Sequence, residues 1–246
     1  MSSSTWTPHA VASRLANCRL PLWRAVEAQH VVATRALVDS LAEQELLEAL
    51  LEQTKPPPPA GTAGLDYLLY TPFRYPPQHY GSRFRRYTDP GVWYGADVVR
   101  TSCAELGHWR WRFVIESHGL ERLDGVPHTL FQATARGRGI DLRTEPFVRD
   151  QVAWCDANDY RSCQALAHSA RAAAAQLIRY QSVRDPQHGG CAAVLDARAF
   201  TGTGGVHRRQ SWFLTVDRQR ASWVRAGTRR AETHEFIFAT GAVASR

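Results

Sequence analysis

Four consecutive prolines, Pro56–Pro59, divide this chain of 246 residues into two unequal parts. Proline has no backbone N–H and a fixed φ, so a helix cannot run through this stretch, which we expect to be a stiff, extended connection. The charge changes sign at the same place. Up to Thr54 there are 4 basic and 6 acidic residues, a net of −2, whereas from Lys55 onward 26 basic and 17 acidic residues give +9. The sequence therefore predicts an N-terminal extension, residues 1–60, and a main domain, residues 61–246.

The N-terminal extension has the periodicity of helices. Between Trp23 and Gln53 the apolar residues fall on two different arcs of a helical wheel, and the change occurs near Ser40. Ser40 and Glu43 fit a capping box, in which both side chains satisfy free N–H groups at a helix start. We therefore predict a helical extension made of two helices with a break near Ser40. The two arcs hold Val31, Leu37, Val38 and Leu41, and then Leu46, Leu47, Leu50 and Leu51.

The main domain mixes strand and helix patterns and is predicted to be α+β. Trp109–Ile115 alternates large apolar residues with others, which indicates a strand with one apolar face. Small and apolar residues recur at helical spacing over 163–180, where Asn158 or Asp159 could cap the start. A shorter helix is expected over 97–106. Further strands are predicted at 92–94, 129–135, 192–195, 211–216 and 235–239.

Composition narrows the class of protein. The net charge of +7 favours an anionic partner or substrate over a cationic one. The five cysteines are scattered and form no C-x-x-C pair, so neither a zinc site nor a disulfide framework is indicated. The histidines show no metal-binding spacing either. With no leader pattern at the start and no run of about 18 apolar residues, we expect a soluble, cytoplasmic protein that does not associate with membranes.

The segment Thr71–Asp97 concentrates arginine and tyrosine among prolines and glycines, a composition that suits a pocket for an anionic ligand carrying a ring. Taken singly, its residues also have ordinary explanations. Arg83 could form a salt bridge, and Tyr94 could pack at the edge of a core. Glu105 could be a solvated carboxylate beside a buried helix stripe, and Ser182 could end a helix.

Five short motifs lie along the main domain: Pro72–Tyr75, Gly81–Phe84, Trp93–Ala96, Cys103–Glu105 and Tyr180–Ser182. Through them the chain resembles the RES-domain family, named for an arginine, a glutamate and a serine, whose studied members are toxins of bacterial toxin–antitoxin systems. The spacing is regular, with 11 residues from Arg83 to Tyr94 and 11 more from Tyr94 to Glu105. The resemblance covers about residues 61–239, so the main domain is expected to be a RES domain.

The resemblance implies a fold like the ADP-ribosyltransferase catalytic core, a split mixed β-sheet with flanking helices, to which the N-terminal helical extension is added. It implies an enzyme that consumes NAD⁺ by breaking the bond between nicotinamide and ribose, with water or inorganic phosphate as acceptor. Transfer of ADP-ribose to a protein is the alternative. It further implies that no metal is needed and that a cognate antitoxin protein blocks the site, and it leaves homo-oligomers open.

Carried over residue by residue, the resemblance implies that Arg83, Glu105 and Ser182 are catalytic. It implies that Arg74, Arg83, Tyr94 and Ser182 bind NAD⁺. These residue types fit the chemistry. Arginine pairs with pyrophosphate oxygens, an aromatic ring suits the cationic nicotinamide, and a carboxylate stabilises the positive charge that develops on the ribose.

Two other functions stay open at this point. The charge of +9 on the main domain and its mixture of arginine and aromatic residues also fit a basic nucleic-acid-binding module. The arginines cluster around glycines and tyrosines instead of lining a helix, so we expect no direct nucleic-acid binding. The other alternative is an interaction protein that keeps the fold without activity.

Overall fold

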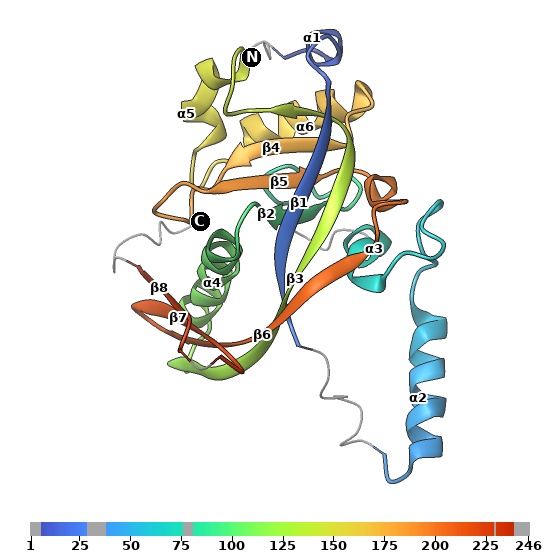
Figure 1. Cartoon of the computed structure of the whole chain (residues 1–246), viewed down its shortest axis with the longest axis vertical. Helices are drawn as coiled ribbons and strands as arrows, with labels where there is room; N and C mark the ends of the chain where they lie inside the picture. The colour runs from blue at the N-terminus through green and yellow to red at the C-terminus, as the bar shows by residue number, and fades with distance from the viewer. Residues whose placement is uncertain (1–5, 29–37, 76–80, 229, 239–246) are drawn as a thin grey trace.

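The computed structural model in Figure 1 is an α+β fold built on one mixed sheet of eight strands. The structure describes residues 6–28, 38–75, 81–228 and 230–238. The strands lie in the order β1-β2-β5-β4-β3-β6-β7-β8. Their bounds are β1 Ala16–Glu27, β2 Trp93–Ala96, β3 Arg122–Asp141, β4 Leu177–Gln181, β5 Gly190–Val194, β6 Val206–Asp217, β7 Arg220–Arg225 and β8 Thr233–Ile237.

The sheet closes on itself around its first five strands. β1 pairs with β2 at Trp23 and Ala96, and with β3 along its whole length. β2 then pairs with β5, β5 with β4, and β4 with the end of β3, which completes the ring. Two strands share the other edge of β3: β6 pairs with residues 122–133 and β4 pairs with residues 139–141. The sheet splits where β4 and β6 diverge, which confirms the predicted split mixed sheet, and in Figure 1 β4 and β5 run across β1 and β3.

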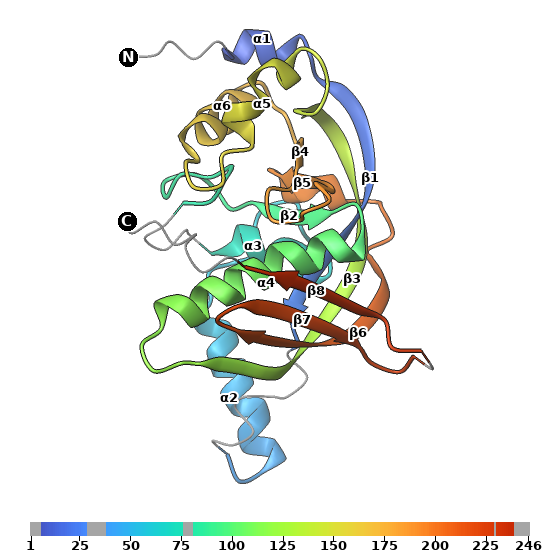
Figure 2. The same cartoon turned by 90° about the vertical axis from the view of Figure 1, so that its left-hand side faces the viewer.

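Helices cover the sheet at both ends (Figure 2). α4 packs along β6, β7 and β8, whereas α1 packs on α6 at the opposite end. α2 projects from the body and leads through the prolines to α3. No described helix is long and apolar enough to span a membrane. The bounds are α1 Pro8–Ala12, α2 Leu41–Thr54, α3 Tyr67–Arg74, α4 Val99–Glu116, α5 Gln151–Trp154 and α6 Arg161–Ala172, with short 3₁₀ helices at Phe147–Asp150 and Ala197–Phe200.

The N-terminal extension is only partly helical. The helix predicted after Ser40 is confirmed as α2, because Ser40 Oγ accepts a hydrogen bond from the N–H of Glu43 at 3.1 Å. The Glu43 carboxylate accepts one from the N–H of Asp39 at 2.9 Å. The helix expected before it is wrong where the chain forms β1, and residues 29–37 lie outside the described residues. Because β1 lies within the sheet, residues 1–60 do not form a separate helical unit.

The strand predicted over 109–115 is wrong, since the chain is helical there. The helix expected over 97–106 continues through this segment as α4. Trp111 faces the core, whereas Trp109 and Phe113 are about half exposed on the other side. The alternation of large residues thus reflects two faces of one helix, because residues four apart share a face.

The long helix predicted over 163–180 is half right. α6 ends at Ala172, and Ala174 then adopts a left-handed φ of 59° that terminates the helix. β4 follows, inserted between β3 and β5. The residue at the helix start is Tyr160, which makes no capping hydrogen bond. The Asp159 carboxylate accepts a hydrogen bond from the backbone N–H of Arg161, the first residue of α6, at 2.9 Å, so Asp159 satisfies a free N–H at the helix start, as predicted.

The other predicted strands are confirmed, because they overlap β2, β3, β5, β6 and β8, with Ala239 outside the described residues. Trp93 of β2 is fully buried and packs edge-on against Phe200, with ring centroids 5.0 Å apart. Its indole N–H donates to the carbonyl of Leu68 at 3.2 Å. This side chain fastens β2 to α3, and β2 carries Tyr94 on the next residue.

Candidate active site

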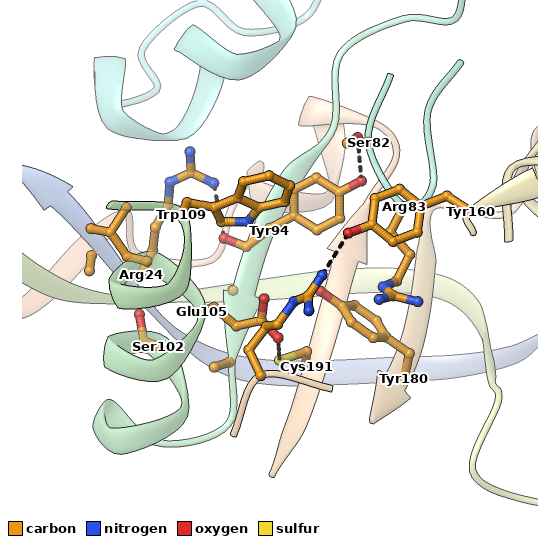
Figure 3. A pocket seen from close by; sticks show the side chains of 15 residues that line it. Arg24, Ser82, Arg83, Tyr94, Ser102, Glu105, Trp109, Tyr160, Tyr180 and Cys191 are labelled. Carbon is orange, nitrogen blue, oxygen red and sulfur yellow. Dashed lines mark hydrogen bonds between the residues drawn. The ribbon is translucent and has the colours of Figure 1, made fainter. Parts of the chain in front are cut away.

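A cavity of about 210 Å³ lies between α4 and strands β1, β2, β4 and β5 (Figure 3). Of the five predicted site residues, three line it: Arg83, Tyr94 and Glu105. The remaining lining residues are Arg24, Ala25, Ser82, Gly95, Ala96, Ser102, Leu106, Trp109, Tyr160, Tyr180, Arg184 and Cys191.

Glu105 provides the carboxylate of this cavity from the second turn of α4. Its Oε1 accepts a hydrogen bond from Ser182 Oγ at 2.6 Å, and the thiol of Cys191 lies 4.0 Å from the same oxygen. Burial raises the pKa of Glu105, while the Ser182 hydrogen bond and the nearby Arg184 and Arg83 oppose that rise. The result is a carboxylate that a hydrogen bond holds in one orientation, facing the cavity.

Ser182 lies behind the cavity wall, beside Glu105. It is completely buried and does not line the cavity wall. Its Oγ accepts hydrogen bonds from the N–H groups of Arg184 and Asp185 at 3.1 and 3.0 Å. Because those bonds use its acceptor sites, the hydroxyl donates its single proton to Glu105. In this structure Ser182 therefore positions Glu105 from outside the cavity wall, and its predicted contact with NAD⁺ stays a prediction.

Arg83 lies on the opposite wall with only 8% of its surface exposed. Its Nη1 donates to the carbonyls of Trp154 and Asp156, both at 2.9 Å. Its guanidinium lies over the ring of Tyr160, 4.6 Å from the centroid. These contacts fix the cation in place without a carboxylate partner among the described ion pairs, so its charge remains available to an anionic ligand.

Tyr94 connects this arginine to the sheet. Its hydroxyl is 2.7 Å from Ser82 Oγ and accepts the N–H of Phe84 at 3.1 Å. Burial raises the pKa of Tyr94, so the phenol stays neutral. The hydroxyl thus holds both neighbours of Arg83 in the turn, and the ring itself forms part of the cavity wall. The prediction that Arg83, Tyr94 and Glu105 surround one cavity is confirmed geometrically.

Arg24 is a site residue that the sequence reasoning missed. It projects from β1, donates from Nη1 to the carbonyl of Tyr94 at 2.9 Å, and lies over the ring of Trp93 at 5.2 Å. Its Nε is buried without a hydrogen-bond partner, and no described ion pair includes this arginine. Burial lowers its pKa to about 10. An arginine inside an apolar run, Leu20–Val26, was the available signal, but the part of that run from Trp23 onward was interpreted as helix.

Arg74 does not line this cavity, and its predicted role in binding NAD⁺ stays a prediction. It ends α3, and its side chain pairs with Glu52 of α2 at 2.8 Å and donates to the carbonyl of Pro56. It lines a second cavity, which also contains Arg24. These contacts hold the Arg74 guanidinium between α3 and the C-terminal end of α2.

The raised pKa of Glu105 predicts a pH-dependent stability. When a carboxyl has a higher pKa in the folded chain than the usual 4.5, the folded state loses stability as the pH rises from 4.5 to the folded pKa, and the full cost remains above that value. Glu105→Gln removes this cost. We expect the variant to be more stable than the wild type near neutral pH, with the difference vanishing below about pH 4.5. Urea unfolding across the pH range measures it, and a variant that is less stable at neutral pH would contradict the assignment.

The model of the RES domain family matches residues 58–217. The chain belongs to the RES domain family. No curated protein matches the chain at a significant level. Among solved structures, the RES-domain chain is similar to one titled as the M. tuberculosis MbcT–MbcA toxin–antitoxin complex, with 16% identity, a TM-score of 0.45, and coverage of 81% of this chain and 86% of the other.

The family match places Arg83, Tyr94, Glu105 and Ser182 inside the RES domain. Arg24 lies ahead of the matched segment, on a strand that the fold returns to the same cavity. In the part of the chain that the structure describes, no group of three or more histidine, cysteine, aspartate or glutamate side chains could hold a metal ion.

Proposed function

We propose that this RES-domain protein is an NAD⁺-degrading enzyme that breaks the bond between nicotinamide and ribose and acts as the toxin of a toxin–antitoxin pair. The observation that carries the proposal is the orientation of Glu105. A fully buried serine holds this carboxylate in a cavity whose other charged side chains are arginines. Membership of the RES domain family supports it, because the family resemblance implies this chemistry.

The carboxylate suits glycosidic cleavage. As nicotinamide leaves, positive charge builds on C1″ of the ribose and its ring oxygen, and a fixed negative group nearby lowers the energy of that state. The electron pair of the C–N bond departs with neutral nicotinamide. Glu105 also accepts hydrogen bonds from ribose hydroxyls, which holds C1″ in place, and the ring of Tyr94 provides a wall for the nicotinamide.

The arginines suit the pyrophosphate. A cavity of about 210 Å³ is smaller than the roughly 300–1,000 Å³ of sites that hold a whole ligand. It therefore receives the nicotinamide riboside end, and the phosphates remain at its mouth. Arg24 has no carboxylate partner among the described ion pairs, so a phosphate oxygen there would gain a charge-assisted hydrogen bond without breaking an existing salt bridge.

The acceptor decides the product. Attack of water on C1″ gives ADP-ribose and releases a proton, attack of inorganic phosphate gives ADP-ribose 1″-phosphate, and attack of a protein side chain gives an ADP-ribosylated protein. The purified chain is incubated with NAD⁺, with and without phosphate and candidate proteins, and free nicotinamide and the ribosyl product are measured by mass spectrometry. Release of nicotinamide supports the proposal. Its absence at high enzyme concentration, with folded protein, overturns it.

A toxin that consumes NAD⁺ requires a neutralising partner. We propose an antitoxin protein that covers the mouth of the Glu105 cavity. Expression of the wild-type chain alone should lower cellular NAD⁺ and stop growth, whereas the Glu105→Gln variant should do neither. Growth arrest that is equally strong with the variant would contradict a mechanism based on NAD⁺ cleavage.

Replacing Ser182 by alanine should weaken catalysis through Glu105. The lost hydrogen bond currently lowers the pKa of this carboxyl, so Ser182→Ala raises that pKa further. The acidic limb of the pH–rate profile should move to higher pH, and the maximal rate should fall by about tenfold because the carboxylate loses its orientation. Ser211→Ala, an exposed serine on β6, is the control. An unchanged acidic limb in Ser182→Ala would contradict this role.

A further inference from the structure

A second cavity of about 770 Å³ lies on the other side of Arg24. It is bounded by the C-terminal end of α2, by α3, and by parts of β1, β3 and β6. The proposed cleavage does not use it. Its size is within the range of about 300–1,000 Å³ that is typical of ligand sites.

α3 turns a polar, aromatic face toward this cavity. Tyr67, Tyr70, Thr71 and Arg74 follow the spacing i, i+3, i+4 and i+7, and all four line the cavity. The opposite face of the helix packs on the core through the fully buried Leu69. The tyrosines are therefore presented to the cavity by a fixed helix, and the side chain of Tyr75 extends the aromatic surface.

Four cationic side chains and the two carboxylates of Glu27 and Glu52 line the cavity, and this excess of positive charge favours an anion. Arg74 and Lys55 both pair with one carboxylate, that of Glu52, so the two cations are only half neutralised. Arg24 enters from β1 without a described ion-pair partner. Arg209 pairs with Asp66 at the rim. A ligand with an aromatic ring and a phosphate matches this combination of tyrosines and cations.

Arg24 connects the two cavities. β1 and β2 are paired at Trp23 and Ala96. Next to that pair, the Arg24 side chain of β1 donates a hydrogen bond to the Tyr94 carbonyl of β2. It lines both cavities, so a single ligand could extend from one to the other past its guanidinium. Figure 3 shows this guanidinium pointing away from Glu105.

We propose that the second cavity binds the adenylate half of NAD⁺, with the pyrophosphate on Arg24 and the adenine against the tyrosines of α3. The inference rests on the proposed function. It assigns a substrate-binding role to α3 and to the segment that leads into it, including Arg74, whose position outside the Glu105 cavity is thereby explained. The enzyme then distinguishes dinucleotides from mononucleotides at a site remote from the bond that breaks.

The experiment compares NAD⁺ with nicotinamide mononucleotide, which has the same scissile bond but no adenylate. The variants are Tyr67→Ala and Tyr75→Ala, whose side chains are 48% and 41% exposed and are not needed for the core. Tyr87→Ala, 66% exposed and outside both cavities, is the matched control. Loss of a stacking ring should raise KM for NAD⁺ by roughly 5- to 100-fold with kcat little changed. For nicotinamide mononucleotide, kcat/KM should stay at the wild-type value.

The outcomes separate this inference from the proposed function. Equal losses for both substrates, or no change for NAD⁺, would overturn the adenylate site while cleavage stands. If the wild type cleaves neither substrate, the proposed function fails, and calorimetric titration with ADP-ribose tests the cavity independently. Binding that Tyr67→Ala weakens and Tyr87→Ala does not supports the site. No binding by the wild type, or equal binding by all variants, overturns it.

Discussion

Glu105→Gln should lower the rate of nicotinamide release by about 100- to 1,000-fold, equivalent to about 3–4 kcal/mol of transition-state stabilisation. The amide keeps the size of the side chain and can still accept the hydrogen bond from Ser182, which is 2.6 Å long in the wild type. It removes only the negative charge. Because that charge acts mainly when the ribose becomes cationic, kcat should fall while KM for NAD⁺ changes little.

The matched control lies on the same helix. Glu116 ends α4, is exposed, and pairs with Arg112 one turn earlier. Glu116→Gln should leave kcat within about twofold of the wild type, since exposed pairs of this kind contribute little. A loss of less than tenfold in Glu105→Gln, with the control behaving as expected, would show that this carboxylate does not stabilise the transition state.

Arg24→Met should separate stability from activity. Losing a charge-assisted contact with the pyrophosphate should lower kcat/KM for NAD⁺ by about 10- to 100-fold, mostly through KM. The stability of the folded chain should not decrease. A pKa lowered to about 10 from the usual value of an arginine means that burying this cation costs on the order of 3 kcal/mol at neutral pH. The lost hydrogen bond to the Tyr94 carbonyl offsets roughly 1–2 kcal/mol of that gain.

The measurements are steady-state kinetics and denaturant unfolding. Arg24→Met should unfold at the same denaturant concentration as the wild type or a higher one. Arg19→Met, an exposed arginine on the same strand, is the control and should leave both kinetics and stability unchanged. If Arg24→Met instead lost more than about 2 kcal/mol of stability, Arg24 would be a structural residue and the kinetic loss would carry no information about the ligand.

Local signals in the sequence predicted local structure correctly. The capping box of Ser40 and Glu43 begins a helix as expected, because both partners lie within one turn. The spacing of apolar residues predicted the wrong secondary structure in two segments whose conformation depends on contacts with residues distant in the sequence. Leu20–Val26 forms a strand because β3 pairs along it, and Trp109–Phe113 is helical because β7 supports one face. Neither neighbour can be found from the segment itself.

The residues of the candidate site also fall into two groups, those that the sequence identified and those that only the structure revealed. The resemblance to the RES-domain family identified Arg83, Tyr94 and Glu105, which come from a turn, a strand and a helix that follow one another directly. It did not point to Arg24, which reaches the cavity through the topology of β1, and it could not show that Arg74 lines a second cavity beside Glu52. The role of Ser182 as a support behind the carboxylate required coordinates, because a buried serine and a ligand-binding serine look alike in sequence.

The position of β1 has a practical consequence for anyone who expresses a shortened version of this protein. A recombinant fragment that starts at residue 58, where the family match begins, would lack β1, which is one of the five strands of the closed ring. It would also lack Arg24, which lines the cavity. It would leave the whole length of β3 facing β1 unpaired and prone to self-association. Trimming designed from family boundaries should therefore stop before Ala16.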